Sequence, residues 1–364
     1  MVYSFPGKVA NNNRKVPKRL FRMVKVRQTE RIREYILDNV EGHPQDIARV
    51  TSEKFGVSRS AVSKHLRSLV DGGFLKSSGT TSARRYSLRK ILDESWRFKV
   101  DEIEEDRVWR EYVRPHLKEL SENIYGICYF GFTEMLNNVI DHSESEEARI
   151  HLSRTATNIT IDVIDAGVGI FRKIQTEFDL HDPRHALLEL SKGKLTTDEE
   201  KHTGEGIFYT SRMFDKFTII SGTLCFLREN DEDDWLIETT EGENLRGTLI
   251  RLEIKTKTRR TPEEIYEKFA AGDEGFDFSR THVPLQLLLY EGEELISRSQ
   301  AKRLLMRLDG FKEVLLDFKG IKRVGQAFAD EIFRVYRNAH PQVEIIAIGA
   351  TDNVQQMIVR VRRR

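Results

Sequence analysis

The chain has 364 residues, 39% of them hydrophobic and 32% charged, so it is too long for one ordinary core and too apolar for global disorder. Its 59 Lys and Arg residues nearly balance 58 Asp and Glu residues, and the total charge therefore identifies no class of partner. Apolar runs are too short to span a membrane, and no apolar stretch follows the N-terminal charges as in a secretory signal. We expect a cytoplasmic, multi-domain α/β protein with three domains and no membrane partner.

Residues 1–28 carry charge of one sign. The segment contains eight basic residues and no acidic one. Such a segment neutralises phosphates when it lies beside a nucleic-acid-binding domain. We therefore interpret residues 1–28 as a basic N-terminal arm.

Residues 29–90 show the order helix, helix, turn, helix, hairpin. Apolar positions recur at helical spacing up to Gly42, and Pro44 and Ser58 are placed to begin the second and third helices. Gly56 separates these two helices by a tight turn. The predicted helices cover 29–42, 44–55 and 59–70, and the predicted strands cover 74–76 and 84–88.

This segment resembles the winged helix-turn-helix family, chiefly in VSRSAVSKHLRSLVDGGFL (57–75) and RRYSL (84–88). The resemblance implies that the third helix enters the major groove of double-stranded DNA while the wing meets phosphates. Such modules usually act in pairs on two half-sites, so a homodimer is expected. The alternative is a winged helix that binds protein, with its charges merely solvated. The DNA-contacting residues would be Arg59, Ser60, Ser63, Lys64 and Arg67 on the helix, with Arg84 and Arg85 on the wing.

Residues 91–108 are rich in both signs of charge, and Trp96 and Val100 lie four positions apart. This spacing predicts a linker helix between domains. A solvated connection and a lever that transmits strain are both compatible with the pattern.

Residues 109–256 form the second predicted domain. Helical periodicity runs from Trp109 to about Ile140, with a break expected near Gly126 or Gly131. The helix ends in a polar row on one face, formed by Glu134, Asn138, Asp141 and His142. Because carboxylates and amides on a half-apolar helix are costly to bury without a ligand, the row indicates a cation or phosphate site.

Two glycine motifs follow this helix. Strands over 148–153 and 158–164 lead into Asp165-Ala-Gly167-Val-Gly169, and Gly204-Glu205-Gly206-Ile207 begins a further helix. Backbone N–H groups at a helix N-terminus provide a cradle for phosphate. Strands over 217–227, 235–240 and 247–254 complete the predicted sheet.

The motifs EMLNN, DAGVGI, TGEGI and a final GT occur in the order that is typical of the GHKL ATPase family, which this stretch resembles. The resemblance implies that Mg-ATP binds here, with Mg²⁺ on Asn138, the adenine amino group on Asp165 and the attacking water near Glu134. Residues 182–203 would be an ATP lid. The other implied contacts are Asp141, Gly167, Gly169 and Thr248 around the adenine, Thr203, Gly204, Glu205, Gly206 and Ile207 around the phosphates, and Lys194 as a candidate phosphate ligand.

Residues 257–364 alternate between strands and helices. Strands are predicted over 285–290, 314–318 and 343–347, and helices over 298–308 and 325–339, the first with a capping box of Ser297 and Gln300. The run VLLDFKGIKRVGQAFADEIF (314–333) resembles STAS domains, in which a serine in the turn usually accepts phosphate. Here the turn reads Gly325, Gln326 and Ala327, and none of these side chains has a hydroxyl group to accept phosphate. The domain would then serve for docking to a protein partner, for dimer contact or in a purely structural role.

The three resemblances together predict a winged helix-turn-helix, then a GHKL α/β sandwich, then a small STAS-like α/β domain. The leading hypothesis is a nucleotide-gated DNA-binding regulator with slow ATP hydrolysis, for which the cofactors are ATP and Mg²⁺. The alternatives are an anti-sigma-type serine/threonine kinase that acts on a separate partner, and a sensor or effector in host defence.

Overall fold

The computed structural model describes residues 18–80, 83–195, 204–229, 235–238, 246–270, 278–289 and 293–363. The chain divides into two compact units. One holds the chain up to Ile91 together with Thr155–Thr157, and the other holds Leu92–Arg154 with Asn158–Arg364. Within the described ranges, no helix combines the length and the apolar character needed to cross a membrane.

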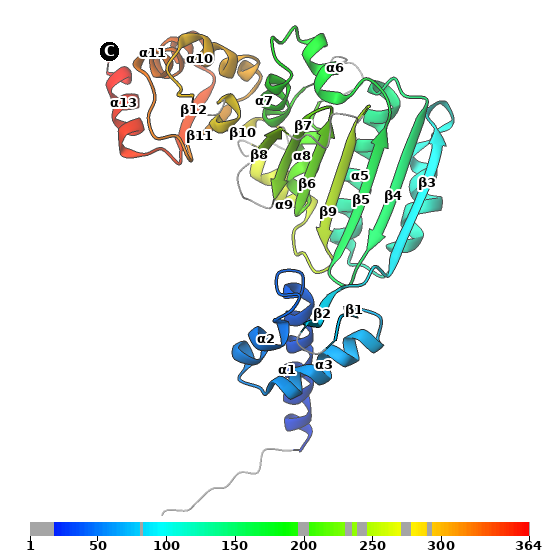
Figure 1. Cartoon of the computed structure of the whole chain (residues 1–364). Coiled ribbons are helices and arrows are strands. Elements are labelled where there is room, and N and C mark those ends of the chain that lie inside the picture. Colours follow the sequence, from blue (N-terminus) through cyan, green and yellow to red (C-terminus); the bar gives the residue numbers. More distant parts are fainter. Residues whose placement is uncertain are drawn as a thin grey trace, which may run out of the picture. The chain divides into compact units, whose positions relative to one another are not determined.

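The first unit is a three-helix core followed by a hairpin (Figure 1). Buried apolar side chains of the three helices and the first strand form one cluster of their own. Strand β1 runs antiparallel to β2, with Leu75 opposite Leu88. The elements are α1 (Lys18–Asn39), α2 (Ile47–Phe55), α3 (Arg59–Asp71), β1 (Leu75–Ser78) and β2 (Arg85–Leu88).

Helix ends in this unit follow from local residue chemistry. Gly56 ends α2 in the left-handed conformation (φ 63°), and the Ser58 hydroxyl accepts a hydrogen bond from the Ala61 N–H at the start of α3. Two boundaries differ from the prediction. Helix α1 begins at Lys18, inside the predicted arm 1–28, whose first 17 residues lie outside the described ranges. Helix α2 begins at Ile47 instead of 44, since residues 44–46 form a turn that precedes it.

The second unit contains a seven-stranded antiparallel sheet in the order β3-β4-β5-β9-β6-β7-β8. Figure 1 shows the strands side by side. Alternation places Ile159, Ile161 and Val163 of β5 in the core. The strands are β3 (Leu92–Lys99), β4 (Glu147–Arg154), β5 (Asn158–Asp165), β6 (Lys216–Ser221), β7 (Leu224–Glu229), β8 (Trp235–Glu238) and β9 (Leu249–Lys255).

The predicted linker helix at 91–108 is wrong for most of its length. Residues 92–99 form edge strand β3, which pairs antiparallel with β4 from Leu92↔Arg154 to Lys99↔Glu147. A spacing of four, as between Trp96 and Val100, fits a strand face as well as a helix face. Only the short α4 (Glu105–Val108) at its end is α-helical.

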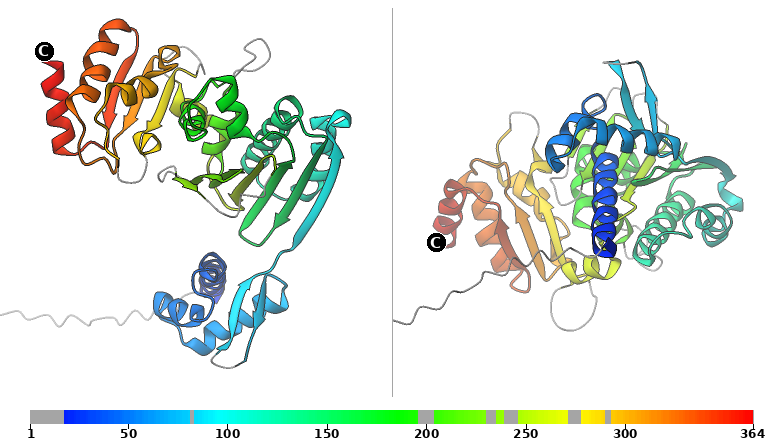
Figure 2. Two further views of the ribbon diagram at one scale, coloured as in Figure 1. Left: turned by 45° about the horizontal axis from the view of Figure 1, so that its top comes forward. Right: turned by 90° about the horizontal axis from the view of Figure 1, so that it is seen from below.

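Helices α5 and α8 lie together against one face of the sheet (Figures 1 and 2). The predicted break in the first helix lies earlier than Gly126, at 117–121, and both glycines lie inside α5. Gly131 is needed there because a Cβ would overlap the Phe214 ring beside α8. The helical elements are η2 (Val100–Glu102), the π-helical turn η3 (Trp109–Val113), η4 (Arg114–His116), α5 (Glu122–His142), α6 (Ile170–Glu177), α7 (Arg184–Lys192), α8 (Gly206–Met213) and α9 (Pro262–Phe269).

The C-terminal domain, residues 278–363, has a three-stranded parallel sheet in the order β10-β11-β12. The capping box of Ser297 and Gln300 is confirmed at the start of α10. The strand predicted at 285–290 is wrong, since the strand lies earlier and 285–288 form a 3-10 turn. The elements are β10 (Arg280–Pro284), η6 (Leu285–Leu288), α10 (Arg298–Leu305), η7 (Leu308–Gly310), β11 (Glu313–Asp317), α11 (Gln326–Asp330), η8 (Glu331–Tyr336), α12 (Arg337–Ala339), β12 (Glu344–Ile348) and α13 (Asp352–Arg362).

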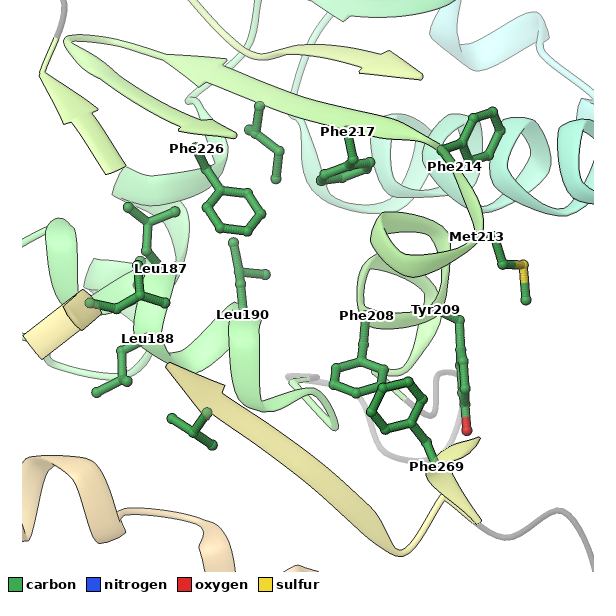
Figure 3. Packing of buried hydrophobic residues seen from close by; sticks show 14 of the residues in the cluster. Leu187, Leu188, Leu190, Phe208, Tyr209, Met213, Phe214, Phe217, Phe226 and Phe269 are labelled. Atoms are coloured by element: carbon green, nitrogen blue, oxygen red, sulfur yellow. The ribbon is translucent and has the colours of Figure 1, made fainter. Parts of the chain in front are cut away.

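The predicted boundary between 256 and 257 is not a break in packing. Residues on both sides of it share one hydrophobic core. Phe208 of α8 lies 4.9 Å from the Phe269 ring of α9 and 4.4 Å from the Phe278 ring that precedes β10, and Phe278 in turn lies 5.3 Å from Phe311. Figure 3 shows Phe208 against Phe269, with Leu190 of α7 near Phe226 of β7. The seven-stranded sheet and the C-terminal domain therefore belong to one compact unit.

Candidate functional site

A cavity of about 290 Å³ lies in the second unit, beside α5 and the ends of β5 and β9. Its walls come from segments that are far apart in the sequence, and the predicted residues Glu134, Asn138, Asp165, Gly169, Gly204, Gly206, Ile207 and Thr248 all lie among them. The apolar part of the lining includes Met135, Val139, Ile174, Phe178, Leu190, Leu195, Phe208 and Ile250. An enclosed mixture of this kind is typical of small-molecule sites.

The face of α5 explains which of its polar residues reach the cavity. Glu134, Asn138 and His142 follow one another at intervals of four, and all three line it. Asp141 is exposed and lies outside the lining. Because each residue turns a helix by about 100°, Asp141 lies on the flank of the stripe that Asn138 and His142 define. Asp141 therefore does not line the cavity directly, unlike the other polar residues of the predicted row.

Asp165 brings a carboxylate to the end of β5, where it is only 6% exposed. Its Oδ1 accepts hydrogen bonds from the N–H groups of Gly167 (2.9 Å) and Thr248 (3.2 Å). Burial raises the pKa of Asp165, and these hydrogen bonds oppose the rise because they stabilise the charged form. Thr248 also accepts a hydrogen bond from the Ile170 N–H at 3.0 Å, so β9 and the start of α6 are fixed around this carboxylate.

Three glycines leave the backbone close to its neighbours. A Cβ at Gly167 would overlap the Ser143 carbonyl oxygen, and one at Gly169 (φ 83°) would lie 2.5 Å from Ser221 Oγ. A Cβ at Gly206 would overlap Glu134 Oε2. Gly167 thus lets the turn after β5 approach the backbone at the end of α5, and Gly169 lets it approach Ser221 of β6. At Gly206 a side chain would require the end of the Glu134 side chain to move.

The Gly204–Ile207 segment begins α8, with Glu205 at the N-cap position. Gly204, Gly206 and Ile207 line the cavity, whereas Glu205 does not. Thr203 lies outside the described residues. Backbone N–H groups at the first turn of a helix are suited to an anionic ligand.

Glu134 lies close enough to the Tyr266 hydroxyl of α9 to act on its charge. Burial raises the pKa of Tyr266 to about 12, and the negative charge of Glu134 adds to the rise. Tyr266 therefore stays a neutral hydroxyl next to the carboxylate.

Lys194 does not lie on the cavity. Its Nζ donates a hydrogen bond to the Gly310 carbonyl oxygen at 3.1 Å and lies 5.0 Å from the centre of the Phe311 ring. The predicted phosphate contact is thus absent from the described site, because the side chain turns toward the C-terminal domain. A different lysine lines the cavity: Lys173 of α6, whose Nζ bonds Glu144 Oε1 at 2.7 Å.

Sequence reasoning did not identify the contribution of α6. Ile170, Lys173, Ile174 and Glu177 line the cavity at intervals of three, one and three. This spacing is the one-sided pattern of a helix that faces a pocket. The same one-sided spacing is visible in the sequence IFRKIQTE of α6.

The predicted DNA-contacting residues lie on the first unit. Arg59, Ser60, Ser63, Lys64 and Arg67 are all exposed on α3, and Arg84 and Arg85 are exposed at the start of β2. Ser63 Oγ donates to the Arg59 carbonyl oxygen at 2.9 Å, and the Arg85 guanidinium lies 2.8 Å from the side-chain amide of Gln45. The core residues Val62, Leu66 and Leu69 occupy the opposite side of α3.

Comparison with known families identifies a domain in the C-terminal part of the chain. Residues 300–355 match the family described as STAS-like domain of unknown function (DUF4325). This match covers most of α10 to α13 in the C-terminal domain, so the predicted STAS-like domain is confirmed. None of the curated proteins matches the chain.

Proposed function

We propose that this protein is a DNA-binding regulator of the winged helix type, and that Mg-ATP bound in the cavity of a GHKL-type domain controls its DNA binding. The observation that carries the proposal is the cavity itself. It gathers Asn138, Asp165, Gly206 and Thr248 from four separate segments around one space of about 290 Å³. That set combines an amide for a cation, a buried carboxylate for a base edge and a helix N-terminus for phosphate.

The residues present fit a purine nucleotide in specific ways. Asp165 keeps Oδ1 on two backbone N–H groups, which fixes the carboxylate as an acceptor toward an adenine amino group. Gly167 and Gly169 let the turn after β5 pack closely against Ser143 and Ser221, which positions Asp165, and Val168 adds an apolar side chain to the lining where a base would lie. Asn138 would hold Mg²⁺, and Gly204, Gly206 and Ile207 would hold the phosphates. Bound Mg-ATP would supply a terminal phosphoryl group for transfer to water, with ADP as the leaving group.

Glu134 is the proposed catalytic residue. A carboxylate near bound ATP can orient a water molecule and accept its proton. Glu134 lines the cavity and touches the start of α8 through Gly206, so it lies at the proposed phosphate end of the site. We propose slow hydrolysis that limits the lifetime of the ATP-bound state.

The exposed basic face of α3 supports double-stranded DNA as the partner of the first unit. Arg59, Lys64 and Arg67 are exposed along one helix, and Arg84 and Arg85 add charge at the hairpin. Loss of one phosphate contact is expected to weaken binding to all DNA sequences alike. It should also reduce the slope of log affinity against log salt concentration by about one. Homodimerisation on paired half-sites remains part of the proposal.

The STAS-like domain is proposed as a site for protein contact. It does not fit a phosphoacceptor at the turn before α11, because a Cβ at Gly325 would lie only 2.7 Å from Ile296 Cα. Phosphate transfer to this turn would need both a hydroxyl and space that the turn lacks.

The proposal is tested by DNA titration of the native chain with and without Mg-ATP, beside the Asn138→Ala variant. We expect a nucleotide-dependent change in DNA affinity or footprint for the native chain, which the variant loses. Equal affinity, footprint and oligomeric state in both conditions would refute gating. Label from the γ-phosphate that appears on a protein, and not as free phosphate, would favour a kinase.

A further inference from the structure

Helix α7 is buried along nearly its whole length, although it carries charges. From His185 to Lys192 every residue is buried, with Glu189 2% and Lys192 1% exposed. A buried charge is costly unless it is paired and fully hydrogen-bonded. The position of these two charges therefore needs an explanation.

Lys192 is held mainly by the C-terminal STAS-like domain. Its Nζ donates to Glu189 Oε1 at 2.6 Å, to the Met306 carbonyl oxygen at 2.9 Å and to the Arg303 carbonyl oxygen at 3.3 Å. An ammonium group has three N–H donors, so these three acceptors satisfy it. Both carbonyls lie at the C-terminal end of α10, where the helix dipole attracts a cation.

Other contacts join the same two parts. Thr281 Oγ1 of β10 donates to the Lys192 carbonyl oxygen at 2.6 Å, and the Arg303 guanidinium bonds His185 Nε2 at 3.0 Å. Arg307 lies 3.5 Å from Glu189 Oε2 and also donates to the Lys194 carbonyl oxygen. Residues 185–194 are therefore attached to the STAS-like domain at both ends of the segment.

The same segment forms part of the cavity wall. Leu190 and Leu195 line the cavity, and the Leu195 N–H donates to the Gly204 carbonyl oxygen at 3.1 Å. The side of the segment that carries Lys192 and Glu189 meets the STAS-like domain, while Leu190 meets the cavity. A displacement of α7 from the STAS-like domain must therefore change the wall beside Gly204.

We propose that Lys192 and Glu189 are positioning residues that fix α7 on the STAS-like domain, and so hold Leu190 and Leu195 in the wall of the nucleotide site. Nucleotide binding and attachment of α7 are then linked, and the linkage acts equally in both directions. A protein that binds the STAS-like domain near the end of α10 thereby alters nucleotide affinity. The identity of the ligand rests on the proposed function, whereas the attachment itself does not.

The experiment uses the full chain with Lys192→Met, which removes the closer of the two cations beside the buried Glu189 and leaves Arg307 at 3.5 Å, and with Thr281→Val, a milder change of similar shape. Arg323→Ala is the control, because Arg323 forms an exposed ion pair with Glu294 in the same domain. Three quantities are measured: ATP affinity by calorimetry, hydrogen exchange of residues 184–195 and 204–213 without nucleotide, and stability in urea.

We expect Lys192→Met to weaken ATP binding by about tenfold or more, equivalent to about 1.4 kcal/mol, and Thr281→Val to weaken it several-fold. Both should speed exchange in 204–213, and Arg323→Ala should change neither quantity. If Lys192→Met does not fold, Thr281→Val decides. Folded variants with native ATP affinity and native exchange, even with lower stability in urea, would overturn the inference. A native chain that binds no ATP overturns the proposed function instead, and the exchange measurement still decides the attachment.

Discussion

Replacement of Asp165 by asparagine separates the chemistry of the proposed site from the stability of the fold. The Oδ1 atom of Asp165 already accepts two backbone hydrogen bonds, from Gly167 and Thr248. An asparagine keeps an oxygen there only if its NH₂ group replaces the second carboxylate oxygen. The variant thus changes the group that faces the cavity from an acceptor to a donor, while the loop geometry is retained.

The expected loss of ATP affinity follows from the replacement of an acceptor by a donor at Asp165. A hydrogen bond to a charged group contributes about 1.5–3 kcal/mol, so the loss should weaken ATP binding roughly tenfold to a hundredfold. GTP carries an acceptor where ATP carries an amino group, so the preference for ATP over GTP should narrow. Burial raises the pKa of Asp165, so removal of the charge should leave the free energy of unfolding at pH 7 unchanged or increased.

Asp162→Asn is the matched control on the same strand. Asp162 accepts hydrogen bonds from Arg251 at 2.7 and 2.9 Å, away from the cavity lining. This variant should lose about 1.5–3 kcal/mol of stability and keep its ATP affinity. The assays are calorimetry with both nucleotides and unfolding in urea. If Asp165→Asn binds ATP as tightly as the native chain, the reasoning about the cavity is refuted.

Three further predictions concern the interior. Cys128 is fully buried, and burial raises its pKa to about 12. Iodoacetamide at pH 8 should therefore label Cys128 only after unfolding, which mass spectrometry would show. Equal labelling of the folded and the unfolded protein would contradict this prediction. Gly206→Ala should displace the end of the Glu134 side chain and cost about 1 kcal/mol of stability or less, and Glu134→Ala added to it should remove this cost in urea. A large loss of stability that persists in the double variant would contradict the contact. Burial, with the charge of Arg303, lowers the pKa of His185 below 6.5. As the pH falls below 6.5, the unfolded chain takes up a proton that the folded chain does not, so the free energy of unfolding decreases. His185→Gln should flatten the plot of unfolding free energy against pH, and an identical plot for both proteins would exclude the effect.

The sequence was sufficient where local chemistry determines structure. Ser58 and Ser297 begin helices because their hydroxyls accept N–H groups of the first turn, and Gly56 ends one because it adopts positive φ. These helix ends depend on neighbours in the chain. Asn138 and Asp165 were expected at one site from the resemblance to the GHKL family, and both line the cavity.

The sequence was insufficient where a distant partner decides. Among the described residues, strand β3 pairs with β4 alone, so its charged side chains and half-buried Trp96 resemble those of a solvated helix. The orientation of Lys194 depends on Gly310 and Phe311, more than a hundred residues away, and no spacing near Lys194 indicates them. Asp141 lies outside the cavity lining because residues at intervals of four share one face of α5, and Asp141 falls between two of those positions.

The core that is shared across residue 256 bears on how this protein can be divided or recombined. Phe278 contacts Phe208 on one side and Phe311 on the other, and Thr281 is bonded to the end of α7. A chimera that replaces the C-terminal domain with the domain of a relative must therefore supply matching residues at positions 278, 281 and 303. Otherwise it exposes apolar and charged groups of α7 and α8 that this domain normally covers. The second unit therefore behaves as one packing unit, although only its C-terminal part matches a known family.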